Sequence, residues 1–112
     1  MHYISTRNTG KDYSFKEIFI KGLADDGGLF VPKVLKKYDQ EALKNLKKLN
    51  YLDLAKEIIF PFLGDFISKQ ELYNLLKKSY STFREDEIVK FQDLGEIKIL
   101  ELFHGPTLAF KD

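Results

Sequence analysis

The last twelve residues, ELFHGPTLAFKD (Glu101–Asp112), restrict the structure and chemistry of this chain more than any other segment. A strand-like apolar run meets a Gly-Pro turn, and Thr107 is then followed by three apolar residues and one lysine, Lys111. Lysines normally have polar neighbours, so if this segment is buried, Lys111 lies in a dry environment. Desolvation disfavours the ammonium form and lowers the pKa of a lysine, which makes it a nucleophile or a Schiff-base former.

A second effect acts in the same direction if Thr107 begins a turn into a helix. Lys111 then lies near the positive N-terminal end of that helix, where the dipole disfavours a further positive charge. A lysine with a pKa of ~10.4 must fall to roughly 7–8 to act as a base at neutral pH, and burial and the dipole together can supply that shift. Asp112 can support the environment of the lysine. The alternative interpretation is that Lys111 is simply the first exposed residue of the helix.

The same segment resembles the cofactor-lysine motif of the threonine synthase family, pyridoxal-phosphate (PLP) enzymes of the tryptophan-synthase-β type. In that family the lysine of HGPTLAFKD holds PLP as a Schiff base. Two further blocks are similar to family segments: YISTRN (Tyr3–Asn8), an opening strand, and SFKEIFIKGLADDGGLFVPK (Ser14–Lys33), a helix followed by a double-glycine loop. The chain departs from the family pattern at Thr9, close behind Arg7, where a glycine is usual, so we expect the turn there to differ.

The resemblance implies a mixed α+β chain that is a fragment of a fold type II PLP α/β enzyme. We expect a small N-terminal domain over residues 1–85, with short terminal strands and a central bundle of three to four helices. Residues 86–112 are expected to form a strand pair and the PLP-lysine loop, at the start of a truncated catalytic α/β domain. The family's glycine-rich phosphate loop is absent from this sequence, so we expect a C-terminal catalytic domain to be missing and the 112-residue chain alone to be inactive, without stable PLP.

The reaction that the resemblance implies is the conversion of O-phospho-L-homoserine and water to L-threonine and phosphate. Lys111 is the implied catalytic residue, which binds PLP and moves protons between substrate carbons. The implied cofactor contacts are Lys111, Thr107, Phe110 and His104. The candidate substrate contacts are Ser5, Thr6, Arg7 and Thr107, because hydroxyl and guanidinium groups can bind the phosphate or the carboxylate of the substrate.

These contacts also have structural interpretations that the sequence leaves open. His104, beside the Gly-Pro turn, can hold the loop through hydrogen bonds. Thr107 can cap a following helix, and Phe110 can pack in a core. Arg7 can pair with Asp26 and brace the two N-terminal blocks.

Composition excludes several classes of protein. A chain of 112 residues with 44% apolar and 31% charged residues forms one globular domain at most, and its net charge of +1 gives no general attraction to nucleic acid or membranes. The sequence has no cysteine, no His/Asp/Glu cluster at metal-ligand spacing and no Walker or Rossmann glycine loop. The longest apolar run, Ile58–Leu63, is too short to cross a bilayer. These features predict a cytoplasmic protein without a metal, and the resemblance implies a monomer.

Periodicity and capping residues predict the remaining elements. A Ser14-x-x-Glu17 capping box opens a helix that Gly22 ends in the left-handed conformation. Gly27 and Gly28 are expected to permit positive φ in a tight turn. The other predicted elements are an extended run at Leu29–Val31 that Pro32 ends, a helix capped by Asp39, a helix over Tyr51–Phe60 that Pro61 breaks or kinks, a helix from Ser68 to about Tyr80, and two strands on either side of Asp93–Glu96.

Two other functions fit the same residues. A phospho-lyase that shares the lysine motif would release a 2-keto acid instead of threonine. A non-catalytic interaction module is the second alternative, because ten Phe and six Tyr indicate a surface made to be covered by a partner domain.

Overall fold

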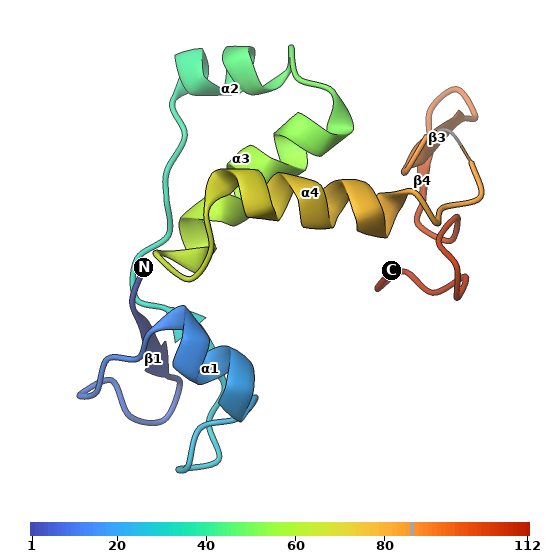
Figure 1. The fold of residues 1–112 in the computed structure, drawn as a ribbon. Helices are drawn as coiled ribbons and strands as arrows, with labels where there is room; N and C mark the ends of the chain where they lie inside the picture. Colours follow the sequence, from blue (N-terminus) through green and yellow to red (C-terminus); the bar gives the residue numbers. More distant parts are fainter. Residues whose placement is uncertain (86) are drawn as a thin grey trace. The chain divides into compact units, whose positions relative to one another are not determined.

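The computed structural model describes residues 1–85 and 87–112. They form two compact units, Met1–Tyr73 and Asn74–Asp112, and the division falls within helix α4 (Lys69–Tyr80). Four helices and two pairs of short strands in the described ranges confirm the predicted mixed fold (Figure 1). The predicted domain boundary between residues 85 and 86 stays a prediction.

Strands β1 (Tyr3–Ser5) and β2 (Phe30–Pro32) form an antiparallel pair in the first unit. The register places Tyr3 opposite Pro32, between the backbone bonds from Thr6 N–H to the Leu29 carbonyl and from Lys33 N–H to the His2 carbonyl. Because hydrogen-bonded and non-hydrogen-bonded pairs alternate, Pro32 occupies a non-hydrogen-bonded position, where its missing N–H is not needed. Pro32 is therefore part of the strand, whereas the sequence predicted that it would end the extended run.

Helix α1 (Phe15–Lys21) begins with the predicted capping box. The Glu17 carboxylate accepts from Ser14 N–H at 2.7 Å, and the Ser14 hydroxyl accepts from Glu17 N–H at 3.3 Å. The helix ends at Gly22 with φ 74° and ψ −56°, and Leu23 N–H donates to the Lys21 carbonyl at 2.9 Å. This is a γ-turn, so the positive φ is confirmed but the left-handed helical conformation was wrong.

The three other helices begin at side-chain caps. Asp39 accepts from Ala42 N–H at the start of α2 (Gln40–Leu46), as predicted. Asn50 caps α3 (Tyr51–Leu63), and the Ser68 capping box opens α4. Helix α3 continues through Pro61 to Leu63, so the helix is not broken there, and the alternative that Pro61 kinks it stays a prediction. Proline lies so close to the end of this helix that its missing donor interrupts only the final turn, and buried Leu63 keeps that turn packed.

The core of the first unit is small and aromatic. Its buried apolar side chains are Tyr3, Tyr13, Ala24, Leu63 and Leu72. The Tyr3 hydroxyl donates to the Phe62 carbonyl at 2.7 Å, which fastens β1 to the end of α3, and burial raises the pKa of this phenol. Phe15 lies beside Phe19 and Phe66, with ring centroids 5.7 and 5.4 Å from its own.

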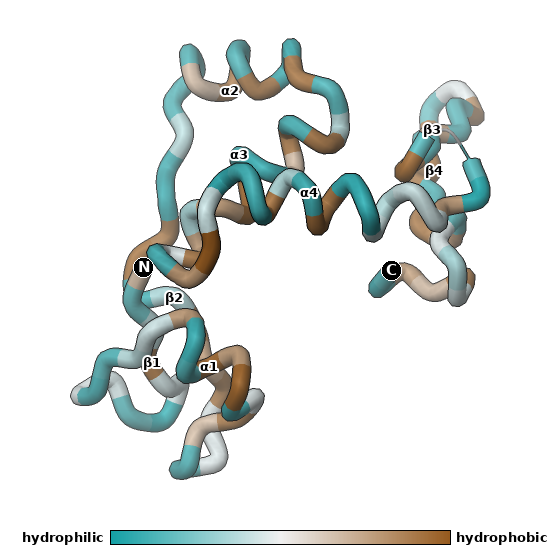
Figure 2. The backbone as a smooth tube through the Cα atoms, in the orientation of Figure 1, coloured by the Kyte–Doolittle hydropathy of each residue, from teal (hydrophilic) through white to brown (hydrophobic). Residues whose placement is uncertain are grey.

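The second unit contains the predicted hairpin. Strands β3 (Lys90–Asp93) and β4 (Lys98–Glu101) pair antiparallel, with Phe91 opposite Leu100. Gly95 has φ 88°, and Leu94 N–H donates to the Ile97 carbonyl at 2.9 Å to close the turn. Apolar side chains on this hairpin, among them Phe91, Ile99 and Leu100, are exposed. Figure 2 colours the apolar residues of the chain brown.

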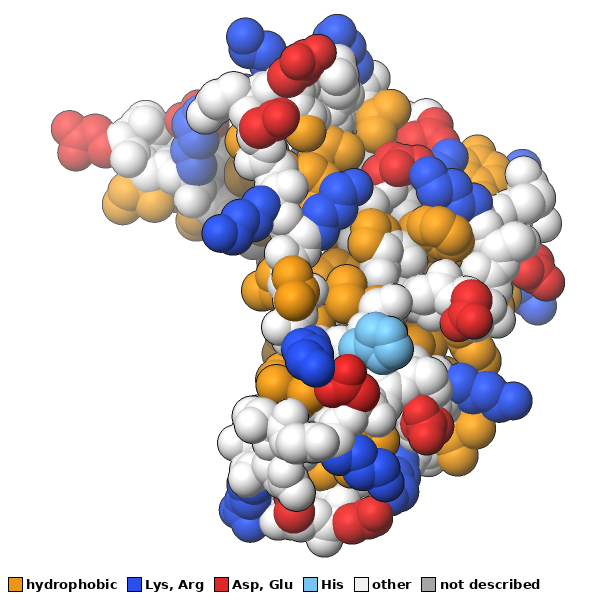
Figure 3. Space-filling model, turned by 90° about the vertical axis from the view of Figure 1, so that its left-hand side faces the viewer, with side chains coloured by type: hydrophobic (Ala, Val, Ile, Leu, Met, Phe, Trp, Pro, Cys, Tyr) orange, Lys and Arg blue, Asp and Glu red, His pale blue; other side chains and the backbone are white. Residues whose placement is uncertain are grey.

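None of the helices in residues 1–85 and 87–112 has the length and apolar character needed to span a bilayer. The same residues hold no cluster of three or more His, Asp or Glu side chains placed to bind a metal ion. On the face drawn in Figure 3, basic and acidic side chains are interspersed, and no broad area carries one sign of charge.

Candidate functional site

Ser5 lies at the centre of a polar network in the first unit, with only 1% of its surface exposed. Its hydroxyl donates to the Asp26 carboxylate at 2.8 Å and accepts from Arg7 N–H at 3.1 Å. The same Asp26 oxygen accepts from Gly28 N–H at 2.8 Å. The Gly28 N–H, then the Ser5 hydroxyl and the Arg7 charge, hold the pKa of Asp26 below its ordinary value. The carboxylate thus stays ionised and connects β1 to the double-glycine loop.

Thr6 and Arg7 also form hydrogen bonds with the double-glycine loop. Leu29 N–H donates to the Thr6 hydroxyl at 3.0 Å, and the Arg7 guanidinium donates to the Asp26 backbone carbonyl at 3.2 Å. The structure therefore brings together three of the four predicted substrate contacts, with Ser5 buried and Thr6 and Arg7 exposed. The bracing interpretation of Arg7 is observed, although the guanidinium meets the carbonyl of Asp26 and not its carboxylate.

The two adjacent glycines of this loop are required for different reasons. Gly27 has φ 77°, as expected for the turn that its N–H closes onto the Ala24 carbonyl. Gly28 has no positive φ; instead, a Cβ there would collide with the Ser5 hydroxyl oxygen and lie 2.9 Å from an Asp26 carboxylate oxygen. The expectation of positive φ was wrong for Gly28, which provides space for the network.

Lys111 is exposed in the second unit, and so are its apolar neighbours, Leu108 at 53% and Phe110 at 72%. The described residues therefore do not give Lys111 the dry environment that the sequence led us to expect. The ammonium lies 5.6 Å from the centroid of the Phe110 ring. Within residues 1–85 and 87–112, Lys111 has no ion pair with an acidic side chain, so its amine is accessible to a ligand.

The loop that carries Lys111 is closed by Thr107 and Asp112. The Asp112 carboxylate accepts from Thr107 N–H at 2.9 Å and from the Thr107 hydroxyl at 2.5 Å. These bonds, the one from the hydroxyl first, hold the pKa of Asp112 below its ordinary value. The segment consists of turns, with Leu108 at φ 61°, and the helix expected to follow this turn stays a prediction.

Gly105 and His104 hold the start of the same loop. A Cβ on Gly105 would collide with the Asp112 side chain, so the glycine makes room for that carboxylate. The His104 ring contacts the Glu101 carboxylate at 2.7 Å, and the backbone carbonyl of His104 accepts from Arg84 N–H. Both side chains of this pair are largely shielded, with 13% and 16% exposed. His104 thus has the structural role that the sequence left open.

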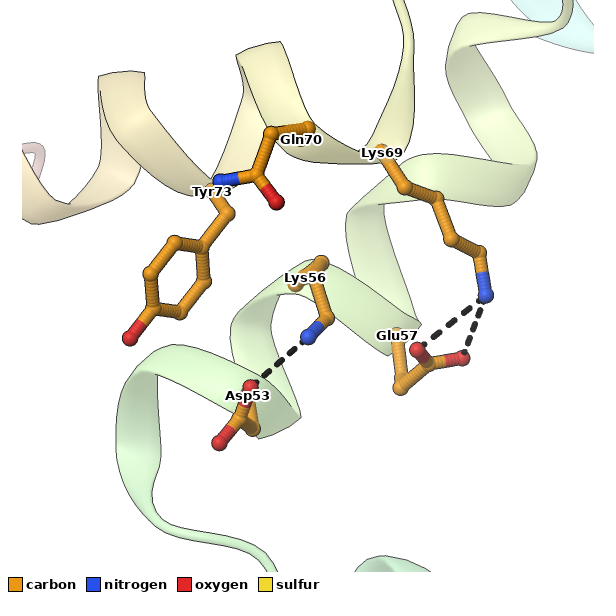
Figure 4. A pocket seen from close by; sticks show the side chains of 6 residues that line it. All are labelled: Asp53, Lys56, Glu57, Lys69, Gln70 and Tyr73. Carbon is orange, nitrogen blue, oxygen red and sulfur yellow. Dashed lines mark hydrogen bonds and ion pairs between the residues drawn. The ribbon is translucent and has the colours of Figure 1, made fainter.

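The described residues also form surface hollows that were not predicted, two of which lie beside α4. One, of about 340 Å³, lies between α3 and the start of α4 (Figure 4). Its charges pair with one another: Lys56 donates to Asp53 at 2.7 Å, and Lys69 donates to Glu57 at 3.2 Å. The other, of about 370 Å³, lies in the second unit, where Pro106 and Asp112 face the end of α4. The only sequence pattern that could have indicated the hollow between α3 and α4 is the Asp53-x-x-Lys56 spacing, which places an ion pair on one helix face.

Comparison with known proteins identifies the family. The family model described as "Threonine synthase N terminus" matches residues 2–80. The threonine synthase of Saccharomyces cerevisiae is 46% identical over 98% of this chain and 23% of its own length, and that of Pseudomonas aeruginosa is 39% identical over 100% and 24%. The PLP-bound threonine synthase of Brucella melitensis superposes with a TM-score of 0.92 at 35% identity, over 99% of this chain and 24% of that one. The chain thus spans about a quarter of each of these proteins. Because the family model matches well over half of its residues, this chain belongs to the threonine synthase family.

Proposed function

We propose that this chain forms part of a threonine synthase, which converts O-phospho-L-homoserine and water to L-threonine and phosphate with PLP as cofactor. The observation that carries the proposal is the ELFHGPTLAFKD segment, whose lysine amine is exposed and, in the described residues, without an acidic partner. An amine must be accessible and able to lose its proton to bond to an aldehyde, and Lys111 meets the first condition. The PLP-bound state of the Brucella relative supports the choice of cofactor.

Some of the residues that would hold PLP are present in this chain. Lys111 would hold PLP covalently, with His104, Thr107 and Phe110 as further predicted contacts. When bound, PLP supplies an electron sink that stabilises carbanions beside the amino group of the substrate. The amine of Lys111 would move protons at Cα, Cβ and Cγ of the substrate. His104 would act through the Glu101 pair that fixes its ring.

The phosphate of the substrate requires cationic or N–H donors, and Arg7 is the exposed cation of the predicted contacts. Ser5 would act by holding the backbone around Arg7, because its hydroxyl already donates to Asp26. The Thr6 hydroxyl, in contrast, accepts from Leu29 N–H and could donate its own hydrogen to the phosphate. We further propose that the 112-residue chain alone has no turnover, since an exposed lysine lacks the dry surroundings that its chemistry requires.

A chimera tests the proposal independently of the residues beyond Asp112. In it, these 112 residues replace the matching region of the yeast threonine synthase. We expect the chimera to release threonine and phosphate in equal amounts from O-phosphohomoserine, and borohydride to fix the cofactor on Lys111, as peptide mass spectrometry would show. Lys111→Ala should abolish both results, while Lys98→Ala, at an exposed hairpin lysine, should change neither.

Three outcomes would contradict the proposal. A 2-keto acid product would assign the chain to a phospho-lyase. Full turnover in the Lys111→Ala chimera would leave a docking role only. Cofactor fixed at another lysine would remove the role of Lys111.

A further inference from the structure

The closure of the lysine loop points to a role for Asp112, the residue after Lys111. Asp112 receives both polar hydrogens of Thr107, from the backbone N–H at 2.9 Å and from the hydroxyl at 2.5 Å. Its own N–H donates to the Ala109 carbonyl at 3.2 Å. Three bonds thus fix a segment of six residues, and Lys111 lies inside it, directly before its closing residue.

A second observation shows that the fold accommodates this closure. Gly105 is buried, and a side chain there would occupy the space of the Asp112 carboxyl group, whose Cγ lies 2.7 Å from the ideal Cβ position. Leu108 takes a φ of 61°, a conformation that is costly for a residue with a branched side chain, at the turn between the two bonded residues. The loop is therefore held in a strained shape by the Thr107–Asp112 contact.

We infer that Asp112 is a positioning residue for Lys111: by holding Thr107, it fixes the loop that presents the lysine amine to its ligand. This inference rests on the proposed function of Lys111. The contact also limits what Thr107 can do. Its hydroxyl has one hydrogen, which goes to Asp112, so toward a ligand Thr107 offers acceptor lone pairs and no donor. An anionic group of the substrate would therefore gain nothing from this hydroxyl while the loop is closed.

The low pKa of Asp112 agrees with this role, because hydrogen bonds from Thr107 favour the ionised carboxylate. Replacing Thr107 with valine keeps the shape and every charge of the loop but removes the hydroxyl donor. Replacing it with serine restores the donor. This pair separates positioning from a direct effect of the Asp112 charge on the neighbouring lysine.

The experiment measures how fast the cofactor-free chimera takes up PLP at Lys111. Samples are quenched with borohydride over time, and the labelled Lys111 peptide is quantified by mass spectrometry. We expect Thr107→Val to slow the uptake of PLP at Lys111 about fivefold. Loss of a buried hydrogen bond to a charged group would have a larger effect, but this loop is exposed to solvent. Thr107→Ser should return the rate to within twofold of the unmodified chimera. Asp112→Asn should slow uptake, and combining it with Thr107→Val should add no further loss. Asp93→Asn, at an exposed hairpin turn where Asp93 accepts from Gly95 N–H, is the matched control and should have no effect.

The outcomes distinguish this inference from the proposed function. If the unmodified chimera labels Lys111 and Thr107→Val labels it equally fast, the positioning role is wrong and the function of Lys111 stands. If the losses from Thr107→Val and Asp112→Asn multiply, the two residues act independently and the inference is also wrong. If the unmodified chimera does not label Lys111, both the function and the positioning role are overturned.

Discussion

Ser5 and Asp26, 21 residues apart in sequence, share a hydrogen bond of 2.8 Å that lies directly against Gly28. The serine hydroxyl fills the space that any side chain at Gly28 would need. The bond therefore links the opening strand to the double-glycine loop and explains why a glycine stands at position 28.

Gly28→Ala is expected to destabilise residues 1–73 by about 1–3 kcal/mol, because the new methyl group collides with the Ser5 hydroxyl. Urea denaturation followed by far-ultraviolet circular dichroism measures this loss. In a Ser5→Ala background, most of the loss should disappear. Gly22→Ala is the matched control: Gly22 has open space but φ 74°, so its cost should be the same with or without Ser5. A cost of Gly28→Ala that does not depend on Ser5 would contradict the steric explanation.

The stability of the first unit should fall in acid. Hydrogen bonds from Gly28 and Ser5 lower the pKa of Asp26, so the folded state binds a proton less readily than the unfolded state. This contribution is fully present above the unfolded pKa, roughly 4, and is lost as the pH falls through the lower folded pKa. Denaturation midpoints measured from pH 7 down to 3 should drop for the unmodified chain and drop less for Asp26→Asn. Equal slopes for the two proteins would exclude Asp26 as a source of the effect.

Pro61→Ala should stabilise the chain by about 1–2 kcal/mol, since alanine restores a donor in α3 and has a far higher helix propensity. Part of the gain is offset because alanine gives the unfolded chain more freedom. Pro32→Ala is the comparison. Pro32 occupies a strand position that needs no donor, so alanine adds no hydrogen bond there. Alanine only gives the unfolded chain more conformational freedom, and the free energy of unfolding should therefore fall by about 0.4–1 kcal/mol. Urea midpoints that shift in the same direction for both variants would contradict these assignments.

Arg7→Met distinguishes bracing from substrate binding. Because the exposed guanidinium is the proposed phosphate contact, we expect the variant to raise the KM of the chimera for O-phosphohomoserine tenfold or more, and loss of its bond to the Asp26 carbonyl should also lower the denaturation midpoint. Lys16→Met, at an exposed lysine of α1, should change neither quantity. A KM that changes less than twofold while the midpoint falls would leave Arg7 with the bracing role alone.

Local patterns in the sequence were sufficient to predict where the helices begin and where the hairpin lies. Ser14, Asp39 and Ser68 each cap a helix through a side chain that lies within three residues of its partner. Such contacts depend on neighbouring residues alone, so a sequence pattern reveals them.

The features that were mispredicted depend on distant residues. Pro61 remains helical because Leu63 is buried and the Phe62 carbonyl receives the Tyr3 hydroxyl. Gly28 is required by Ser5, on another strand. At the candidate site, the motif pointed to Lys111, but the bond between Thr107 and Asp112 comes with a positive φ at Leu108, which no local preference predicts.

The bond between the Tyr3 hydroxyl and the Phe62 carbonyl spans 59 residues and has a consequence for biosynthesis. Strand β1 leaves the ribosome before α3, and it lacks this partner until the end of α3 has been translated and has cleared the exit tunnel. Residues 1–73 should therefore acquire protection from protease in a single late step of elongation, and nascent chains arrested before residue 62 emerges should still be degraded.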